Sequence, residues 1–174
     1  GALLLPPSGD NRGAVTFEQW NRGEWRCHYA AWHRARVFAF DAFLDMFAEM
    51  DGQVVRLNPY TAEVEAHAPS LEEWAAKLLA DYDFETGWSI AHAWQVQNRR
   101  LRQDERLVPR TPFVLGGGYD VDNVVAVEMR HAIGPIAELY EQLRDLPDGA
   151  QIQLHGWNPD SWAAGTLPTT STKS

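Results

Sequence analysis

The chain has 174 residues, 45% of them hydrophobic, and a formal net charge of −9 at pH 7. This content is enough for one buried core, and no apolar run approaches the ~18 to 20 residues that a membrane span requires. A protein with this much negative charge is repelled by nucleic acid phosphates and by anionic membranes. We therefore expect neither a nucleic acid nor a membrane as its partner. The opening residues lack the basic flank of a signal peptide, and the lone Cys27 excludes an internal disulfide. We therefore expect a single cytoplasmic domain.

The charges are unevenly placed along the chain. Residues 37–95 hold eleven acidic residues against Arg56 and Lys77, whereas residues 96–113 hold five arginines against only two acidic residues. An acidic body of this kind steers basic partners toward it, including many nuclease toxins. The same acidity would also simply keep a cytoplasmic protein soluble, and the sequence leaves both interpretations open.

The first half of the chain predicts mostly strands. Residues 1–35 are rich in aromatic side chains without clean periodicity, so we expect an irregular segment with short helical or extended pieces. Residues 36–50 fit both a helical stripe and the alternation of strands. Asp51-Gly52 is a strong hairpin signal, which predicts a strand over 54–57. A further strand is expected over 62–66.

Helix signals are clearer after residue 69. Ser70 and Glu73 have the spacing of a capping box, and helical periodicity continues to about Asp81. The remaining elements that we expect are a helix over 86–98, a basic loop over 99–110, strands over 113–115 and 124–127, a helix over 135–145 and a last strand over 152–154. This order predicts a single-domain α+β fold in which an antiparallel sheet packs against several helices.

The glycine run Gly116 to Gly118 invites comparison with a phosphate-binding loop. Such a loop needs the N-terminus of a helix behind it, and strand-like residues follow here, so we interpret the run as a tight turn. Asp120 and Asp122 on this turn are expected to cap it rather than to bind a cation. The six histidines form no zinc motif, and neither a metal nor a cofactor is expected.

Acidic and aromatic residues supply the candidates for catalysis. Asp41 and Asp45 share one face whether their segment is helical or extended, and neighbouring phenylalanines could desolvate one carboxylate enough for acid or base chemistry. An acidic solvent-exposed face is the competing interpretation. Cys27 could pair with His67 or His92 from a separate element. The tryptophans of the N-terminal segment either fill the core or line a pocket or partner surface.

Three segments carry a resemblance to a known family. They are NPYTAEVEAHAPSLEEWAAKLLADYDFETGW (58–88), ERLVPRTPFVLGGGYDVDNVVAV (105–127) and LRDLPDGAQIQL (143–154). Together they resemble the SUKH superfamily, the Smi/Knr-type proteins that bacteria use largely as immunity proteins against toxins. The resemblance spans roughly Arg36 to Leu154 and favours strands over residues 36–50. It divides the chain into an aromatic-rich N-terminal segment (1–35), a SUKH-like α+β domain (36–157) and a flexible polar tail (158–174).

The resemblance implies a non-catalytic binding protein. Proteins of this kind use variable, often acidic faces to bind and neutralise a toxin, frequently a nuclease or deaminase. The partner implied for this chain is a basic protein toxin. The acidic residues expected to contact it are Asp81, Asp83, Glu85, Asp120 and Asp122.

Two positions depart from the family pattern. Leu44 stands where the family tends to have a glycine, which could reshape the hairpin, and Gly118 stands where an acidic residue commonly follows the paired glycines. The departures leave open an alternative function, that of a small enzyme or cyclase recruited into a biosynthetic pathway to act on a small hydrophobic substrate.

The enzyme alternative makes its own structural prediction. It requires an enclosed aromatic pocket that contains a carboxylate or imidazole with a perturbed pKa. The residues expected to line that pocket are Trp20, Trp25, Phe40 and Phe43. The candidates for its acid or base are Asp41, Asp45, His67 and His92. An immunity protein should instead expose an acidic face and enclose no deep cavity.

Overall fold

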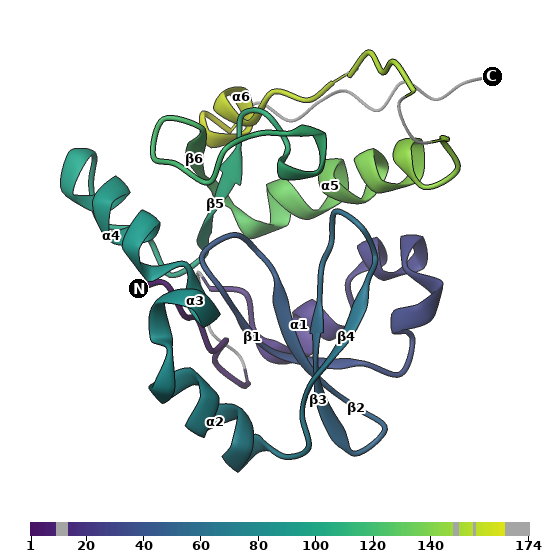
Figure 1. Cartoon of the computed structure of the whole chain (residues 1–174), viewed down its shortest axis with the longest axis vertical. Helices are drawn as coiled ribbons and strands as arrows, with labels where there is room; N and C mark the ends of the chain where they lie inside the picture. Colours follow the sequence, from purple (N-terminus) through teal and green to yellow (C-terminus); the bar gives the residue numbers. More distant parts are fainter. Residues whose placement is uncertain (10–13, 148–149, 155, 166–174) are drawn as a thin grey trace.

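A computed structural model describes residues 1–9, 14–147, 150–154 and 156–165. Two antiparallel sheets form its framework (Figure 1). The larger sheet has four strands in the order β1-β2-β3-β4, and the smaller pairs β5 with β6. The strands are β1 (Arg36–Phe40), β2 (Met46–Met50), β3 (Gln53–Leu57), β4 (Val64–Ala68), β5 (Glu105–Pro109) and β6 (Val124–Glu128). The protein is therefore a single-domain α+β fold, which confirms the predicted class.

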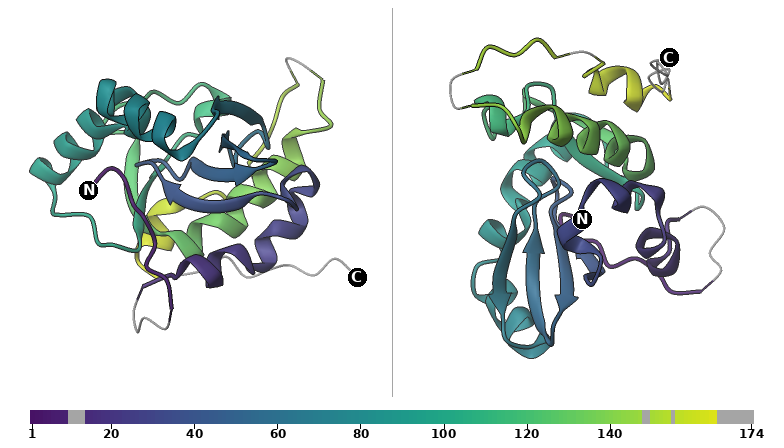
Figure 2. Two further views of the ribbon diagram at one scale, coloured as in Figure 1. Left: turned by 90° about the horizontal axis from the view of Figure 1, so that it is seen from below. Right: turned by 90° about the vertical axis from the view of Figure 1, so that its right-hand side faces the viewer.

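Helices surround the two sheets (Figures 1 and 2). The α-helices are α1 (Phe17–Asn21), α2 (Leu71–Ala80), α3 (Tyr82–Thr86), α4 (Trp88–Gln97), α5 (Met129–Leu143) and α6 (Pro159–Ala163). Three short 3-10 helices are η1 (Glu24–His28), η2 (Ala30–Trp32) and η3 (Phe113–Leu115). Within the described ranges, none of these helices has the length and apolar character needed to cross a bilayer.

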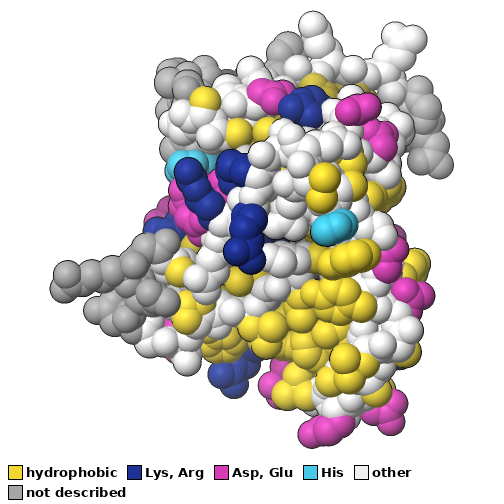
Figure 3. All heavy atoms as spheres, turned by 90° about the vertical axis from the view of Figure 1, so that its left-hand side faces the viewer, with side chains coloured by type: hydrophobic (Ala, Val, Ile, Leu, Met, Phe, Trp, Pro, Cys, Tyr) yellow, Lys and Arg dark blue, Asp and Glu magenta, His cyan; other side chains and the backbone are white. Residues whose placement is uncertain are grey.

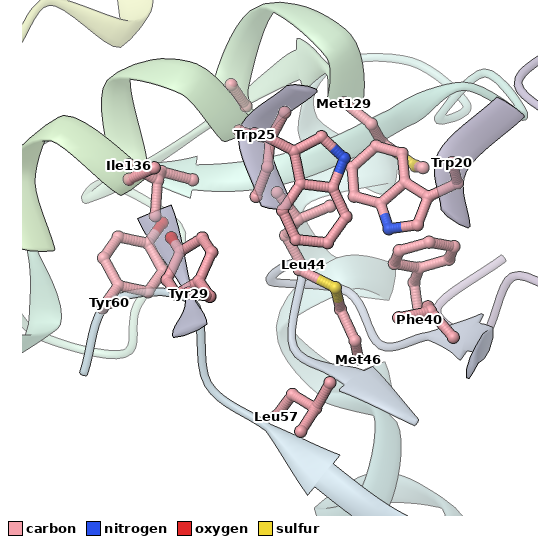
Figure 4. Packing of buried hydrophobic residues seen from close by; sticks show 14 of the residues in the cluster. Trp20, Trp25, Tyr29, Phe40, Leu44, Met46, Leu57, Tyr60, Met129 and Ile136 are labelled. Atoms are coloured by element: carbon pink, nitrogen blue, oxygen red, sulfur yellow. The ribbon is translucent and has the colours of Figure 1, made fainter. Parts of the chain in front are cut away.

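Strand β2 of the four-stranded sheet is buried on both faces over most of its length. Met46 and Ala48 of β2 pack into a large cluster with the N-terminal segment and α5 (Figure 4), whereas Phe47 between them packs against Trp74 of α2. A strand that is covered on both faces has a continuous apolar sequence instead of an alternating one. This explains why residues 36–50 fit two patterns, and the strands that the resemblance favours are confirmed.

The N-terminal segment is irregular, as predicted, but it belongs to the main core. Thr16 caps α1 by accepting a hydrogen bond from the backbone N–H of Gln19 (3.2 Å). Leu4 exchanges two backbone hydrogen bonds of 2.9 Å with Phe40, so the segment covers the free edge of β1. Its aromatic side chains fill the large cluster with almost no exposure; they are Trp20, Trp25, Tyr29 and Trp32.

The local signals for the hairpin and for α2 are confirmed. Asp51 and Gly52 both have positive φ angles, 55° and 82°, in the turn between β2 and β3. Ser70 caps α2 by accepting a hydrogen bond from the N–H of Glu73 (3.2 Å). The strand expected over 62–66 is β4, two residues further on, and α4 is preceded by the separate short helix α3.

The predicted basic loop over 99–110 is right for residues 99–104, which form no helix or strand, and wrong for the residues that follow. Residues 105–109 form β5, in which every residue is buried. Arg99 binds the carboxylate of Glu105 through two hydrogen bonds of 2.6 and 2.8 Å, and the side chain of Arg106 is buried. These charges are thus neutralised or enclosed by the protein, although their sequence pattern is typical of a solvated loop.

The predictions for the last third of the chain also need correction. Residues 113–115 form η3 instead of a strand, and residues 152–154 form no strand. Helix α5 begins at Met129 and accommodates Pro135 in its interior. The expected tail over 158–174 starts with α6, whose Trp162 is buried, and its part from residue 166 lies outside the described residues.

An apolar face lies on the outer side of α2, α3 and α4. Figure 3 shows hydrophobic side chains gathered on this side of the molecule. The large apolar residues of these helices that remain exposed are Leu71, Leu79, Tyr82, Phe84, Trp88 and Val96.

Leu44 occupies a backbone conformation that glycine favours. Its φ is 76°, in the connection between β1 and β2, and its side chain is fully buried in the large cluster. The left-handed region costs a residue with a side chain roughly 1–2 kcal/mol. Truncation of a buried leucine costs about 2–5 kcal/mol. Packing therefore outweighs backbone strain at this position.

We expect the strain at Leu44 to be visible in a pair of substitutions. Leu44→Ala and Leu57→Ala should each cost about 2–5 kcal/mol, because both side chains are fully buried. Changing alanine further to glycine should add about 0.5–1 kcal/mol at position 57, in a strand. At position 44 glycine tolerates the left-handed backbone conformation better than alanine does. This gain should cancel the added cost of the change from alanine to glycine. Urea unfolding of the four variants measures this, and equal alanine-to-glycine increments at both positions would contradict the interpretation.

Candidate functional site

The site is built on the turn that joins β1 to β2. Asp41 accepts hydrogen bonds through Oδ1 from the backbone N–H groups of Phe43 (2.8 Å) and Asp45 (2.9 Å). Its own N–H donates to the carbonyl of Asp45 (3.0 Å). These bonds close the turn and bring the two carboxylates together, through a turn between two strands instead of one face of a helix or strand.

The same turn is bonded to two other parts of the fold. Ala42 donates its N–H to the carbonyl of Thr86 in α3 (2.9 Å), and its carbonyl accepts from the N–H of Leu107 in β5 (2.8 Å). Both bonds use main-chain atoms, so they hold the backbone of the turn in place. The turn therefore connects the larger sheet to the smaller one and to the helices.

Arg56 of β3 binds both carboxylates of the turn. Its Nη2 donates to Oδ2 of Asp41 (2.8 Å) and its Nε donates to Oδ2 of Asp45 (3.0 Å). The guanidinium also lies over the ring of Phe47, 5.7 Å from the ring centroid. The side chain of Asp41 is 2% exposed and that of Asp45 is 18% exposed. One guanidinium thus faces two largely buried carboxylates.

This imbalance changes the protonation of the pair. Burial raises the pKa of Asp41 to about 8, and the charge of Asp45 adds to the rise, whereas Arg56 and the two backbone N–H groups oppose it. Burial also raises the pKa of Asp45, again against the attraction of Arg56. One guanidinium does not compensate two desolvated carboxylates, so the pair retains a proton near neutral pH.

A hollow of about 210 Å³ lies beside the carboxylate pair. Phe113 and Tyr119 stack with their ring centroids 3.8 Å apart, and Phe43 stands edge-on to both. The residues that line the hollow are Asp41, Phe43, Asp45, Arg56, Asn58, Tyr60, Phe113, Val114 and Tyr119. The hollow is therefore lined by both carboxylates, by Arg56 and by the rings of four aromatic residues.

Two further hollows adjoin the first. One of about 460 Å³ extends toward β4 and shares Asp45 and Arg56 with it. The other, of about 360 Å³, extends toward α3 and α4 and shares Asp41 and Tyr119. The residues that the two add to the lining are Glu63, Val64, Glu65, Asp83, Phe84, Gly87, Ser89 and Ile90. The three hollows form one surface depression, which we call the central groove.

The aromatic pocket predicted from the sequence is not formed. Trp20 and Phe40 pack edge to face with their centroids 4.9 Å apart, and both are buried in the large cluster. Trp20 and Trp25 border a separate hollow whose lining contains no carboxylate or imidazole. Only Phe43 of the four predicted residues lines the hollow with Asp41.

The histidine candidates lie outside the groove. Nε2 of His67 is 3.2 Å from Oε2 of Glu85, with both side chains less than a tenth exposed. Burial lowers the pKa of His67, although the charge of Glu85 opposes this. His92 is exposed and stacks on Trp88 with a centroid distance of 4.9 Å. Neither histidine shares a hollow with the carboxylate pair, and Cys27 is exposed on η1.

The acidic residues predicted to bind a partner are dispersed. Asp83 lines the groove, and its carboxylate accepts two hydrogen bonds from Ser89. Asp81 caps α3, whereas Glu85 is buried against His67 and is unavailable to a partner, so that prediction is wrong. The sequence shows where acidic residues occur, but it does not show which of their side chains become buried in the fold.

The glycine run forms a turn, as predicted. Gly116 has a φ of 88°, and a Cβ on Gly117 would lie 1.9 Å from the carbonyl oxygen of Thr111, so only glycine fits there. Asp120 caps the turn by accepting a hydrogen bond from the N–H of Asn123 (2.9 Å). Asp122 is exposed and does not line the groove.

Several residues that line the groove were not predicted from the sequence. One feature of the sequence could have pointed to Arg56. Within residues 37–95, Arg56 and Lys77 are the only arginine or lysine residues among eleven acidic ones. Tyr60, Tyr119, Glu63 and Glu65 had no such feature, because they come from loops and a strand end that meet only in the fold. In the described part of the chain, no three carboxylate, imidazole or thiol groups converge as metal ligands would.

Comparisons with known proteins show a likeness to solved structures. No family model matches the chain, and no curated protein matches it. The crystal structure of Atu4351 from Agrobacterium tumefaciens is similar, with a TM-score of 0.51 and 15% sequence identity. The match covers 72% of this chain and 65% of that one, so this chain spans just under two thirds of its length. At this identity the likeness supports the fold alone.

We expect Asp41→Asn to flatten the dependence of stability on pH. The folded-state pKa of Asp41, about 8, lies above its ordinary value of 3.8. Its contribution is therefore fully present below pH ~4 and is lost as the pH rises through 8. An asparagine side chain cannot titrate, and the substitution should cost about 1–3 kcal/mol at pH 5, and less at pH 8.

Urea unfolding at pH 5 and pH 8 measures this difference. Asp122→Asn is the matched control, because it removes an exposed carboxylate that does not line the groove, and it should keep the wild-type dependence. If the wild type and Asp41→Asn lose the same amount of stability between pH 5 and pH 8, the group that titrates is not Asp41.

Proposed function

We propose that this chain is a non-catalytic binding protein of the immunity type, which acts in the bacterial cytoplasm and uses the central groove to neutralise a basic protein toxin. The observation that carries the proposal is the charge of the groove. Its lining contains five carboxyl groups against the single guanidinium of Arg56, so it stays acidic although the Asp41–Asp45 pair retains a proton. These carboxyl groups are those of Asp41, Asp45, Glu63, Glu65 and Asp83. A concave surface of one sign focuses its field and attracts a partner of opposite charge.

Exposed aromatic side chains at the groove supply contact area. Phe84 is 76% exposed and Tyr119 is 63% exposed, and both line hollows of the groove. Large aromatic side chains are typical energetic centres of protein interfaces, because they bury much area with few rotatable bonds. Acidic charge would thus guide the encounter, and the aromatic residues would hold the complex.

The resemblance to SUKH proteins supports the class of partner. The motifs that carry it are structural, which agrees with a role that needs a surface rather than catalytic residues. We therefore propose a toxin of the nuclease or deaminase kind, whose own substrate-binding surface is basic because it must attract phosphates. An acidic inhibitor would compete for that surface.

An enzymatic function is the weaker proposal. One observation favours it, the raised pKa of Asp41 beside aromatic rings. Both oxygens of this carboxylate already accept hydrogen bonds, however, Oδ1 from two backbone groups and Oδ2 from Arg56. A general acid or base needs an oxygen that can reach a substrate proton. We accordingly assign Asp41 a role in positioning the turn.

The proposal is tested by titrating the protein against basic nuclease and deaminase toxins. We expect stoichiometric loss of activity for the matching toxin. Replacing Glu63 and Glu65 by Gln and Asp83 by Asn should slow association about tenfold at low salt and flatten its salt dependence, because steering depends on local charge. Stopped-flow association rates at low and high salt measure this.

A control variant separates local charge from net charge. Glu24, Glu49 and Glu138 are exposed, lie outside the groove and change the net charge by the same amount when replaced by Gln. This variant should keep a near wild-type rate. Equal slowing in both triple variants, or no inhibition of any toxin tested, would count against the groove as the binding surface.

A further inference from the structure

We infer that the hollow between Asp45 and Tyr119 is a subsite for one arginine side chain of the partner. The identity of the partner rests on the proposed function, whereas the subsite rests on the geometry of the hollow. Three features of that geometry favour a planar cation: the aromatic walls, a carboxylate oxygen without a partner, and the way in which the same carboxylates already hold Arg56.

The walls of the hollow suit a guanidinium. Phe113 and Tyr119 are nearly parallel, with an interplanar angle of 9°, and Phe43 is nearly perpendicular to both. Tyr119 is 63% exposed, which leaves ring surface open to a ligand. A guanidinium stacks on aromatic rings through cation–π attraction and is more weakly hydrated than an ammonium, so it enters such a site at lower cost.

The base of the hollow offers a free acceptor. Oδ2 of Asp45 accepts from Arg56, whereas Oδ1 accepts no hydrogen bond from the described residues. The side chain is 18% exposed and lines two of the three hollows. A carboxylate oxygen held at the base of an aromatic hollow can accept a charge-assisted hydrogen bond from an incoming cation.

Arg56 shows how this protein binds a guanidinium. It donates to Asp41 and Asp45 and lies over the ring of Phe47. The hollow presents the same combination, carboxylates beside aromatic rings, without a second cation among the described residues. An arriving arginine would therefore restore the balance of two carboxylates with two guanidinium groups.

The protonation of the Asp41–Asp45 pair supports the binding of a second guanidinium, which would take the place of a proton. Because burial raises the pKa of Asp41 to about 8, the pair holds a proton when the hollow is empty. A second guanidinium favours the ionised carboxylate, so its arrival releases that proton. The other charged groups that act on this cluster are Glu63 and Glu65 beyond Asp45, Glu85 beyond Arg56, and Arg106 behind Asp41.

The test uses three small probes in place of the partner. They are the Nα-acetyl amides of arginine, lysine and citrulline, and citrulline matches arginine in shape but carries no charge. Titration followed by backbone amide NMR should give saturable shifts at Phe43, Asp45 and Tyr119 with the arginine probe. We expect at least tenfold weaker binding of the lysine probe and no saturation with the citrulline probe.

Variants locate the binding within the groove. Asp45→Asn and Tyr119→Ala should each weaken the arginine probe at least tenfold. Glu138→Gln and Trp88→Ala alter exposed side chains that line none of the three hollows, and they should leave its affinity unchanged. Tyr119 is exposed, so its truncation tests the subsite even if Asp45→Asn lowers stability.

The outcomes separate the subsite from the proposed function. Equal shifts with arginine and citrulline, or unchanged arginine binding in Tyr119→Ala, would overturn the subsite. Inhibition of a toxin that Tyr119→Ala and Asp45→Asn leave intact would keep the immunity function and overturn the subsite. Selective arginine binding in this hollow without inhibition of any toxin would support the subsite and remove the proposed function.

Discussion

The ion cluster of Asp41, Arg56 and Asp45 is the constraint on which the rest of the structure depends. It ties a turn of the larger sheet to β3, and the main chain of that turn is bonded to α3 and β5. Removing Arg56 would leave two buried carboxylates without their cation, and the loss of one partner of a buried ion pair typically costs about 3–5 kcal/mol. The groove exists because this cluster holds the turn while aromatic residues from later in the chain close over it.

How far the sequence predicts the fold depends on whether a signal is local. Asp51-Gly52 and the Ser70 cap report on a few neighbouring residues, and both elements were placed correctly. Strand β5 was missed because two of its residues, Glu105 and Arg106, are charged and yet buried, in a strand that forms only by pairing with β6. No pattern within that stretch distinguishes an enclosed arginine from a solvated one.

The candidate site was also predictable only where the signal is local in the sequence. The spacing of Asp41 and Asp45 was visible in the sequence, and the turn brings them together. Their partner Arg56 is placed by the register of the β2–β3 hairpin, in which it lies opposite Phe47. The predicted tryptophan pocket was wrong because a large aromatic side chain suits a core as well as a pocket, and only the packing decides between them.

Strand β4 ends the larger sheet and, among the described residues, pairs with no strand on its outer side. Such an edge offers unpaired backbone groups that can recruit a strand from a second molecule. Glu65 in this strand and Glu63 just before it place like charges where two copies would meet, so edge-to-edge pairing is repelled. The carboxylates that we assign to partner recognition thus also guard against polymerisation. A change that weakens recognition by removing these charges would at the same time make the protein prone to aggregate.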